Sequence, residues 1–393
     1  MSYQIDKITI EGFKSIRKLE NFDLRSLNVL IGANGAGKSN FVDFFRFLHD
    51  LVQRRLQLAV ATGGGADAYL HRGPKVTTQI AAEISLGALS YRFALVPTED
   101  GRSLIFADEA IGGARFDGWI SLGSGHAESK VKDSDFGTWG ALDNASLGWN
   151  PYHFHDTSTT AGVRRLVAIN DNEYLRPDGS NLAAILYLMH IQFHEDYARI
   201  RDAVRLAAPF FDDFKLRPIP ANPEKIQLEW LQKHSDYPFR ASQLSDGTLR
   251  FACLATALLQ PRFKHVWVGI TIVFDEPELG LHPYALTLLA NLLQQAAQSQ
   301  QVIVSTHAAA LLNEFGPEDV IVVDRVRGES IFQRLDSAHL SEWLQEYTLG
   351  ELWQKNVLGG RPHSEEILPP FDGNSDSIVT AHHDRSGSGG ASS

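Results

Sequence analysis

The spacing of apolar and polar residues changes along the chain and separates strands from helices. Residues 3–31 alternate apolar with polar positions and end in a continuous apolar run, which predicts two antiparallel strands followed by a buried strand. Residues 76–122 alternate again and predict an antiparallel sheet extension. Residues 180–209 repeat apolar positions at helical spacing. Residues 123–150, rich in Gly, Ser and Asp, predict a loop or insertion between these parts.

The last third of the chain alternates short apolar runs with helical patterns. The predicted strands are 266–274, 302–305 and 320–323, and the predicted helices are 284–298 and 308–314. Because strand–helix–strand units bring successive strands parallel, this part predicts a parallel sheet. From Asp372 the chain is rich in Ser, Gly and His, which predicts a disordered tail over residues 372–393.

A glycine-rich segment stands where the first buried strand gives way to a helix. Gly32–Ser39 has the sequence GANGAGKS and fits the phosphate-loop pattern G-x-x-x-x-G-K-[ST]. Its glycines let backbone N–H groups turn toward an anion, and the helix N-terminus adds a positive end. We expect Lys38 to reach the β- and γ-phosphates of ATP and the Ser39 hydroxyl to ligate Mg²⁺. The predicted nucleotide-binding residues of this loop are Asn34, Gly35, Gly37, Lys38, Ser39 and Asn40.

A second apolar strand ends in two carboxylates, at Asp275 and Glu276. This is the pattern of a Walker B segment, in which Asp275 would hold the Mg²⁺ shell and Glu276 would polarise the attacking water as general base. A buried strand that ends in a solvated acidic turn is the structural alternative. The phosphate loop upstream favours the catalytic interpretation.

The segment Gln243–Thr248 lies about thirty residues before Asp275 and has the sequence QLSDGT. It resembles the signature motif of ATP-binding-cassette ATPases, usually LSGGQ, with Asp in place of the first Gly and Thr in place of Gln. The resemblance implies that Ser245 and Gly247 contact the γ-phosphate of ATP bound by a partner subunit. Ser245 is also expected to cap the helix that begins here, a role compatible with phosphate contact.

The segment Gln301–His307 is a short apolar strand that ends in the lone histidine His307. A lone histidine is often structural. In cassette ATPases a histidine at this place, one helix after Walker B, senses the γ-phosphate, and the resemblance therefore implies a catalytic His307. The intervening segment Pro277–Pro283 resembles the family's D-loop, a turn at the dimer contact.

Other segments extend the resemblance beyond the nucleotide site. Glu11–Ser15 resembles the turn that opens RecF-like and SMC-like ATPase heads. Further matching segments are Tyr152–Thr157, Tyr174–Leu182, Leu349–Trp353 and Leu358–Pro362. Together they are similar to a bacterial family of predicted AAA/ABC-type ATPases, compact relatives of RecF and the SMC heads, over roughly residues 3–362. Some relatives serve in DNA repair or anti-phage defence.

The resemblance implies an α/β P-loop NTPase fold of the ABC-ATPase head type, with a mixed central sheet, an antiparallel β extension and a helical subdomain. We expect the head to span residues 1–371. Within it, residues 1–150 would form an N-terminal lobe with the phosphate loop, 151–240 a mainly helical insertion, and 241–371 a C-terminal lobe with the signature, Walker B and His307.

The glutamine that bridges Mg²⁺ and the insertion in this family has no clear counterpart here. Gln79 comes too early, within a strand. The segment Tyr152–Thr157 has a suitable position but offers His153, His155 and Asp156. Either a His/Asp metal site or a polar edge of the nucleotide site would account for them.

Composition limits the remaining function classes. The 393 residues carry a net charge of −11, with 44% hydrophobic and 21% charged residues. No apolar run approaches the ~20 residues of a membrane span, and no leader segment is recognisable. The single cysteine, Cys253, is expected to pack in the core of a reduced, cytoplasmic protein.

The expected partners are a second copy of the chain, joined by ATP, and either DNA or a separate effector protein. The negative charge argues against broad DNA coating but leaves a local basic strip open. Its candidates, which a solvated surface would also explain, are Lys215, Arg217, Lys225, Lys233, Arg240, Arg250, Arg262 and Lys264.

Three other classes fit less well. Only about 70 residues follow Asp324, too few for the nuclease domain of related ATPase–nucleases. There are no long heptad runs for an SMC-type arm. A transporter motor is disfavoured by the signature variant. The sequence thus predicts an ATP-dependent switch or clamp, or else an ATPase subunit that controls an effector such as a nuclease and does not bind DNA.

Overall fold

Five apolar strands that lie far apart in the sequence form a central sheet. Its order is β14-β15-β3-β16-β17. The strands are β3 (Leu27–Ile31), β14 (Thr271–Asp275), β15 (Gln301–Thr306), β16 (Val320–Val326) and β17 (Glu329–Arg334). The first four are parallel, and β17 pairs antiparallel with β16. The parallel-sheet prediction is confirmed, and the carboxyl ends of β3, β14 and β15 meet at one edge.

Both faces of this sheet are covered, which explains its continuous apolar runs. Leu30 packs into the core built around helix α1 (Lys38–Val52), together with Phe41 and Phe44. Val29 and Ile31, which point to the other face, pack into a second core with helices α4 (Leu182–Gln192), α5 (His194–Ala207), α6 (Asp246–Leu259) and α7 (Pro283–Ala297). All five residues of β3 are buried, so the strand that leads into the phosphate loop is fixed from both sides.

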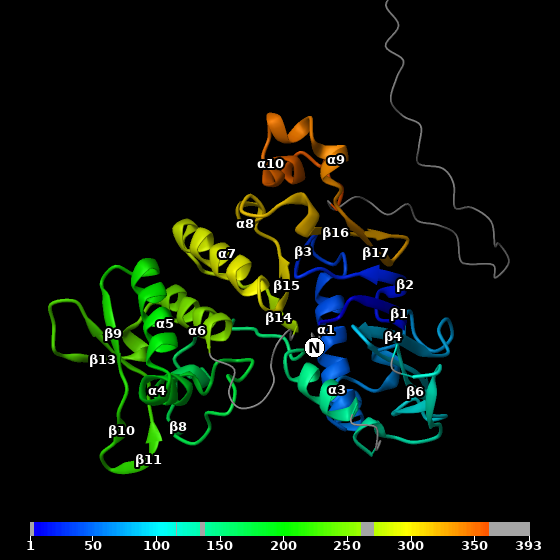
Figure 1. Ribbon diagram of the computed structural model, residues 1–393, viewed down its shortest axis with the longest axis horizontal. Helices are drawn as coiled ribbons and strands as arrows, with labels where there is room; N and C mark the ends of the chain where they lie inside the picture. The colour runs from blue at the N-terminus through cyan, green and yellow to red at the C-terminus, as the bar shows by residue number, and fades with distance from the viewer. Residues whose placement is uncertain (1–3, 115, 134–137, 261–270, 361–393) are drawn as a thin grey trace, which may run out of the picture. The chain divides into compact units, whose positions relative to one another are not determined.

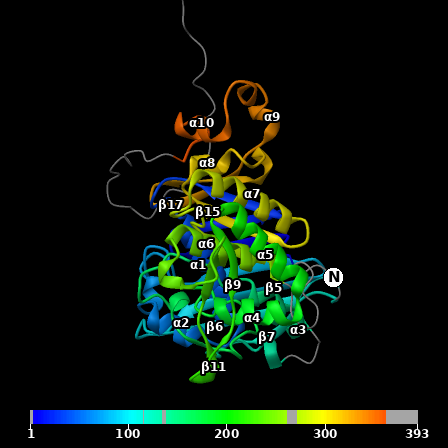
Figure 2. The ribbon, with the colours of Figure 1, turned by 90° about the vertical axis from the view of Figure 1, so that its left-hand side faces the viewer.

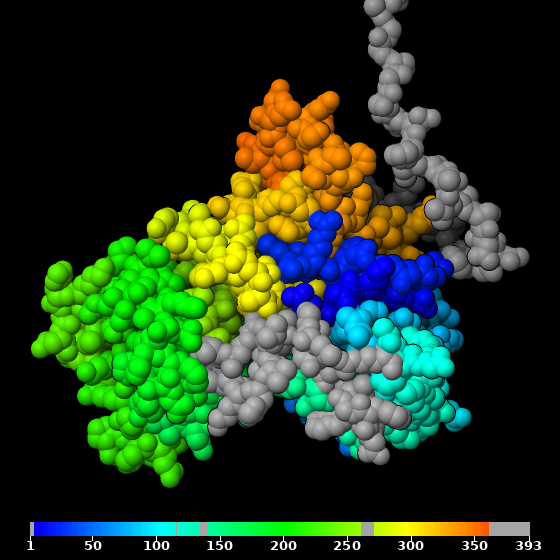
Figure 3. All heavy atoms as spheres, viewed as in Figure 1, coloured from blue at the N-terminus to red at the C-terminus, as the bar shows by residue number. Residues whose placement is uncertain are grey.

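The computed structural model describes residues 4–114, 116–133, 138–260 and 271–360 (Figure 1). A second, six-stranded antiparallel sheet has the order β2-β1-β4-β5-β6-β7. Its strands are β1 (Lys7–Phe13), β2 (Ile16–Asp23), β4 (Ile80–Leu86), β5 (Leu89–Pro97), β6 (Leu104–Gly112) and β7 (Ile120–Gly123). It confirms the antiparallel extension. In the space-filling view, β1 to β3 (blue) lie between the other strands of this sheet, β4 to β7 (cyan), and the last third of the chain (yellow to orange) (Figure 3).

The C-terminal helices follow the predicted alternation. Helix α7 (Pro283–Ala297) connects β14 to β15 and packs against β15 (Figure 2). The shorter helices of the described residues are α2 (Leu56–Thr62), α8 (Ala309–Leu312), α9 (Ser337–Leu340) and α10 (Leu349–Gln354). None of the described helices has the length and apolar character that a membrane crossing requires.

Residues 151–240 differ from the predicted, mainly helical insertion. Helices α4 (Leu182–Gln192) and α5 (His194–Ala207) are present. Six short strands accompany them in two three-stranded sheets, β10-β11-β8 and β13-β12-β9. They are β8 (Val167–Ala168), β9 (Phe211–Lys215), β10 (Pro218–Ile219), β11 (Asn222–Ile226), β12 (Glu229–Gln232) and β13 (Pro238–Arg240). Strands this short, with Pro and charged residues as in β11, show no clear alternation in the sequence.

The predicted loop over 123–150 contains a helix, α3 (Thr138–Leu147). Its sequence includes Gly140, Asp143 and Asn144, which disfavour helix in isolation. Leu142 and Ala145 are fully buried in the core around α1, and this tertiary packing outweighs the low propensity. Residues 266–270 of the predicted strand 266–274, and the predicted tail from Asp372, lie outside the described residues.

Candidate functional site

The phosphate loop connects β3 to α1 at the carboxyl edge of the central sheet. Gly35 and Gly37 have left-handed backbones, with φ of 79° and 112°. Gly37 is the N-cap of α1, and no side chain of the described chain caps this helix. The first-turn N–H groups of α1 are therefore oriented toward a site that suits an anion. Asn34, Gly35 and Ser39 are exposed there.

Lys38 is held against its own loop. Its side chain is buried, and Nζ donates to Gly32 O at 2.8 Å and Ala33 O at 3.2 Å. A third contact joins Nζ to Nδ1 of His307 at 3.3 Å. Burial lowers the pKa of Lys38 to about 8, against the opposing charges of Glu276 and Asp275. An incoming phosphate would replace the two carbonyl oxygens as the partner of this ammonium group.

His307 connects Lys38 to the predicted general base. Burial and the charge of Lys38 lower the pKa of His307, so its neutral form accepts from Lys38 through Nδ1. The proton then resides on Nε2, which lies 3.2 Å from Oε1 of Glu276. The structure thus brings the three predicted catalytic residues, Lys38, Glu276 and His307, into one connected group.

Asp275 ends β14 beside this group. Burial raises its pKa, and Oδ1 is buried without a hydrogen-bond partner among the described residues. A buried carboxylate oxygen without a hydrogen-bond partner is suited to bind a cation. Together with the exposed hydroxyl of Ser39, at the first turn of α1, it offers the oxygen ligands that Mg²⁺ prefers. The residues present are therefore suited to Mg²⁺.

Glu276 has an unusual backbone. Its φ is 45°, in the left-handed region that residues other than glycine rarely adopt. Its N–H donates to Ser305 O at 2.8 Å, which anchors the turn to β15. Local strain of this kind is concentrated at functional sites. Here it accompanies the side chain that contacts His307.

Glu278, in the D-loop segment, was not predicted as a site residue. Its Oε1 accepts from the Thr306 hydroxyl at 2.7 Å and from the backbone N–H of His307 at 2.8 Å. The side chain is buried. It fixes the position of His307, and the sequence signals it only by a third carboxylate two residues after Glu276.

The segment Tyr152–Thr157, hereafter the bridge segment, lies along β14. Tyr152 N donates to Val273 O at 2.8 Å, and Asp275 N donates to Tyr152 O at 3.2 Å. His155 Nε2 donates to Asp275 O at 3.1 Å. The described residues contain no cluster of three His, Cys, Asp or Glu side chains that would hold a metal ion, and this removes support for a His/Asp metal site here. A polar edge of the nucleotide site is the better interpretation.

The signature segment begins helix α6 (Asp246–Leu259). Ser245 is its N-cap, and its Oγ accepts from Thr248 N at 3.2 Å, as predicted for the cap. Ser245 and Asp246 are exposed. A Cβ at Gly247 would lie 2.6 Å from Gly280 O, so the signature and the D-loop segment of the same chain are in close contact. Cys253 is buried further along α6, as predicted.

Comparisons with known proteins bear on the fold and on the class of enzyme. Residues 119–313 match the family described as "AAA domain, putative AbiEii toxin, Type IV TA system", and residues 4–80 match "AAA ATPase domain". A solved SMC head bound to the C-winged helix domain of ScpA is 16% identical, with a TM-score of 0.58, over 86% of this chain and 99% of that one. A second SMC head, from Pyrococcus furiosus and bound to the C-terminal domain of ScpA, gives 15% identity and a TM-score of 0.54, over 87% and 99%.

The chain is an ATPase with matches to two AAA families. Its fold is that of an SMC head, and the predicted fold class is confirmed. A search of curated proteins finds no match.

Asn40 of the ATPase, which is predicted to contact the nucleotide, also makes a contact within the chain. Its Nδ2 donates to the Ser15 hydroxyl at 2.6 Å. Ser15 Oγ lies 2.6 Å from Ser330 Oγ, and Ser330 donates to Ala36 O at 2.6 Å. Asn40 therefore belongs to a polar chain that supports the phosphate loop from β17. A Cβ at Gly37 would collide with Ser330, which is a second reason for glycine there.

The basic residues that were candidates for DNA contact and lie on strands are divided between two sheets, and Lys215 and Arg240 lie on the outer strands of one of them, on either side of Glu229. Lys215 is exposed on β9 and Lys225 on β11, which belong to different sheets, and Lys233 and Arg240 are exposed near β13. Arg217 pairs with Glu229 at 3.1 Å. Arg250 donates to backbone carbonyls and is not a free surface charge. Arg262 and Lys264 lie outside the described residues.

Proposed function

We propose that the ATPase hydrolyses Mg²⁺-bound ATP as a homodimer and that ATP acts as the switch that joins the two copies. The observation that carries this proposal is the position of Ser245. Its hydroxyl is exposed and bonds only Thr248 among the described residues, while its helix start contacts Gly280 of the D-loop segment. A helix N-terminus of this kind suits a phosphate presented from outside the chain.

Exposed apolar side chains next to this helix start support a protein contact. Leu279 lies within the D-loop segment and is 38% exposed. Tyr284 follows the segment directly and is 54% exposed. Apolar side chains beside a functional loop are typical of interfaces. In the proposed dimer, the phosphate loop of one subunit would bind ATP and Ser245 of its partner would contact the γ-phosphate.

The geometry suggests how hydrolysis proceeds. When Lys38 pairs with the β- and γ-phosphates it leaves Gly32 O, Ala33 O and Nδ1 of His307. His307 then remains bonded to Glu276 through Nε2. Glu276 takes the proton of the water that attacks the γ-phosphorus, and the bond from that phosphorus to the β,γ-bridging oxygen breaks to release ADP. Ser39 and Asp275 would hold Mg²⁺, which neutralises charge on the phosphate oxygens.

The Glu276→Gln variant tests the dimer. It retains the phosphate-binding groups and loses the base, so it should bind ATP, hydrolyse it at least about a hundredfold more slowly and accumulate as a dimer. Light scattering with saturating ATP measures the mass. Adding Ser245→Arg should restore the monomer, whereas Ser341→Arg, at an exposed serine after α9, should leave the dimer intact. A monomeric Glu276→Gln protein at saturating ATP would contradict the proposal.

The biological setting that we propose is DNA repair or anti-phage defence. The match to a family described as a putative AbiEii toxin supports defence. DNA bound by the ATP dimer is one candidate partner, and such binding would weaken steeply with salt. Fluorescence anisotropy with labelled duplex and Glu276→Gln, with and without ATP at low and moderate salt, tests it. Equal, weak binding in all four conditions would exclude DNA.

A separate effector protein, such as a nuclease, is the second candidate partner. The distribution of Lys215 and Lys225 over two different sheets, with Arg217 neutralised by Glu229, favours it over DNA. The solved SMC heads bound to ScpA domains are examples of heads that bind a protein. Affinity capture on the Glu276→Gln protein with ATP, compared with Lys38→Ala, should retain the effector only on the former.

A further inference from the structure

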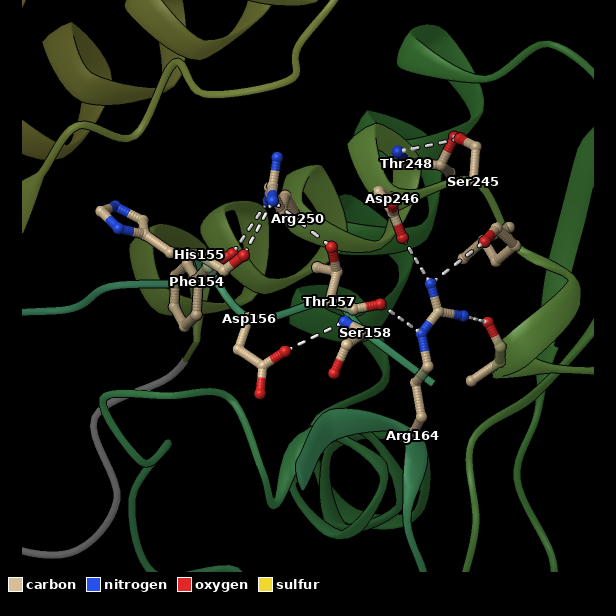
Figure 4. Close-up of polar contacts among 12 residues, drawn as sticks. Phe154, His155, Asp156, Thr157, Ser158, Arg164, Ser245, Asp246, Thr248 and Arg250 are labelled. Carbon is tan, nitrogen blue, oxygen red and sulfur yellow. Dashed lines mark hydrogen bonds and ion pairs between the residues drawn. The ribbon is translucent and has the colours of Figure 1, made fainter. Parts of the chain in front are cut away.

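A buried arginine binds several residues of the loop that leads into the signature. Arg164 is 8% exposed, and its guanidinium donates to Thr157 O at 2.8 Å and to Ala241 O (Figure 4). A longer contact of 3.5 Å reaches Leu244 O. The same group forms a 2.7 Å ion pair with Asp246, the first residue of α6. Arg164 therefore contacts the chain on both sides of Ser245.

The ion pair has an energetic reason. A guanidinium withdrawn from water requires a counter-charge and filled hydrogen bonds, and Asp246 is the one carboxylate that pairs with it in the described residues. Asp246 also lies in the first turn of α6, where a negative charge is favoured by the helix dipole. The LSGGQ pattern has glycine at this position, which cannot make the contact. Asp246, which replaces that glycine, thus adds an ion pair that fixes the start of α6.

A second arginine holds the same helix start from the other side. Arg250, one turn along α6, donates to Phe154 O at 3.0 Å, His155 O at 2.8 Å and Leu279 O at 2.9 Å. Thr157 is shared: its carbonyl accepts from Arg164, and its hydroxyl lies 3.3 Å from Arg250 (Figure 4). The bridge segment, which lies along β14 at Asp275, is thereby tied to the helix that carries Ser245.

We propose that Asp246 is a positioning residue that acts through Arg164 to fix Ser245 and the first-turn N–H groups of α6 in the direction needed for contact with ATP. The local part of this inference concerns the single chain. The part that concerns ATP held by a partner rests on the proposed function. Loss of Asp246 would leave Arg164 without its counter-charge and allow the loop 241–245 to move, while the phosphate loop would be unaffected.

Hydrogen exchange on the nucleotide-free monomer tests the local part. In Asp246→Ala the amides of residues 241–249 should exchange roughly tenfold faster, while those of residues 32–39 keep their rates. The matched control is Asp196→Ala, which removes a first-turn aspartate of α5 that pairs with Arg199 at 3.5 Å. It should leave residues 241–249 unchanged. Equal exchange of these residues in wild type and Asp246→Ala would overturn the inference.

Kinetics test the functional part. We expect Asp246→Ala to lower kcat roughly tenfold with little change in KM or in the affinity for a fluorescent ATP analogue, because the phosphate loop is intact. Asp246→Glu should recover most of the rate, since it can still pair with Arg164. In the Arg164→Lys background, Asp246→Ala should cause less additional loss than it does alone, because the two residues act together. Faster exchange with unchanged kcat would overturn the functional part.

These outcomes are separate from a failure of the dimer. If Glu276→Gln stays monomeric with ATP, the proposed function falls, while exchange and kcat still decide whether Asp246 positions Ser245. If Glu276→Gln dimerises, adding Asp246→Ala should weaken that dimer roughly tenfold, and Asp196→Ala should not. An unweakened dimer would overturn the role of Asp246 toward ATP held by the partner.

Discussion

The two ends of the ATPase site are built differently. The phosphate-loop end grows out of β3, a strand buried on both faces, and presents backbone N–H groups and a buried Lys38. The signature end is exposed. It is held by the side chains of Arg164 and Arg250, which donate hydrogen bonds to backbone carbonyls. A site formed by backbone within a packed sheet is rigid, whereas one anchored by side chains can be displaced by small changes. The comparison predicts that the first end determines ATP affinity and the second determines turnover.

The largest effect should come from Lys38→Ala. It removes the ammonium group that is placed to pair with the β- and γ-phosphates, so ATP binding and hydrolysis should both be lost. Isothermal titration with ATP and steady-state phosphate release measure the two. Ser245→Ala is the matched change at the other end and should retain binding while turnover falls. Equal phosphate release by wild type and Lys38→Ala would contradict the claim that the phosphate-loop end determines ATP binding.

A smaller effect is expected at the signature end from Gly247→Ala. The added Cβ would lie 2.6 Å from Gly280 O, so either α6 or the D-loop segment must shift. We expect kcat to fall by roughly one order of magnitude while ATP affinity stays the same. Gly140→Ala, in α3, has open space around its Cβ and should leave both unchanged. A lower ATP affinity for Gly247→Ala would show that the two ends are not separate.

The last effect is on stability and not on turnover, and it concerns His153, which joins the ends through its contact with Arg46 of α1. Burial, followed by the charges of Arg46 and His155, lowers the pKa of His153 to about 4. The folded protein then binds fewer protons than the unfolded chain between pH 6.5 and 4, so stability should fall as the pH falls through this window. Urea unfolding at pH 7 and pH 5 measures the change.

The loss at the acidic end of that window should be at most about 3 kcal/mol, from the shift between the two pKa values. His153→Asn should flatten this part of the profile. His339→Asn, at a histidine whose side chain is 86% exposed, should not. If His153→Asn loses as much stability between pH 7 and pH 5 as the wild type, a group other than His153 causes the loss.

The site could be predicted from the sequence where its parts are local. The phosphate loop, the two carboxylates after β14 and the histidine after β15 each occur in one short segment, and the order of strands and helices brings them to one edge. Arg164 and Arg250 could not be found in this way, because each binds carbonyls from segments 77 to 96 residues away. Arg250 even resembled a solvated surface charge in the sequence. The strands of residues 211–240 were missed because they are too short and too polar for periodicity to reveal.

The left-handed backbone at Glu276 carries a consequence for anyone who selects variants of this protein by heat resistance. A glycine at this position would adopt the same φ of 45° without the conflict that a Cβ creates, a relief of roughly 1 kcal/mol. Selection for thermostability alone would thus favour a molecule without Glu276, the general base that we propose. If Glu276 has that role, the native residue lowers stability slightly and is kept for turnover, so a screen of this enzyme needs turnover as a second criterion.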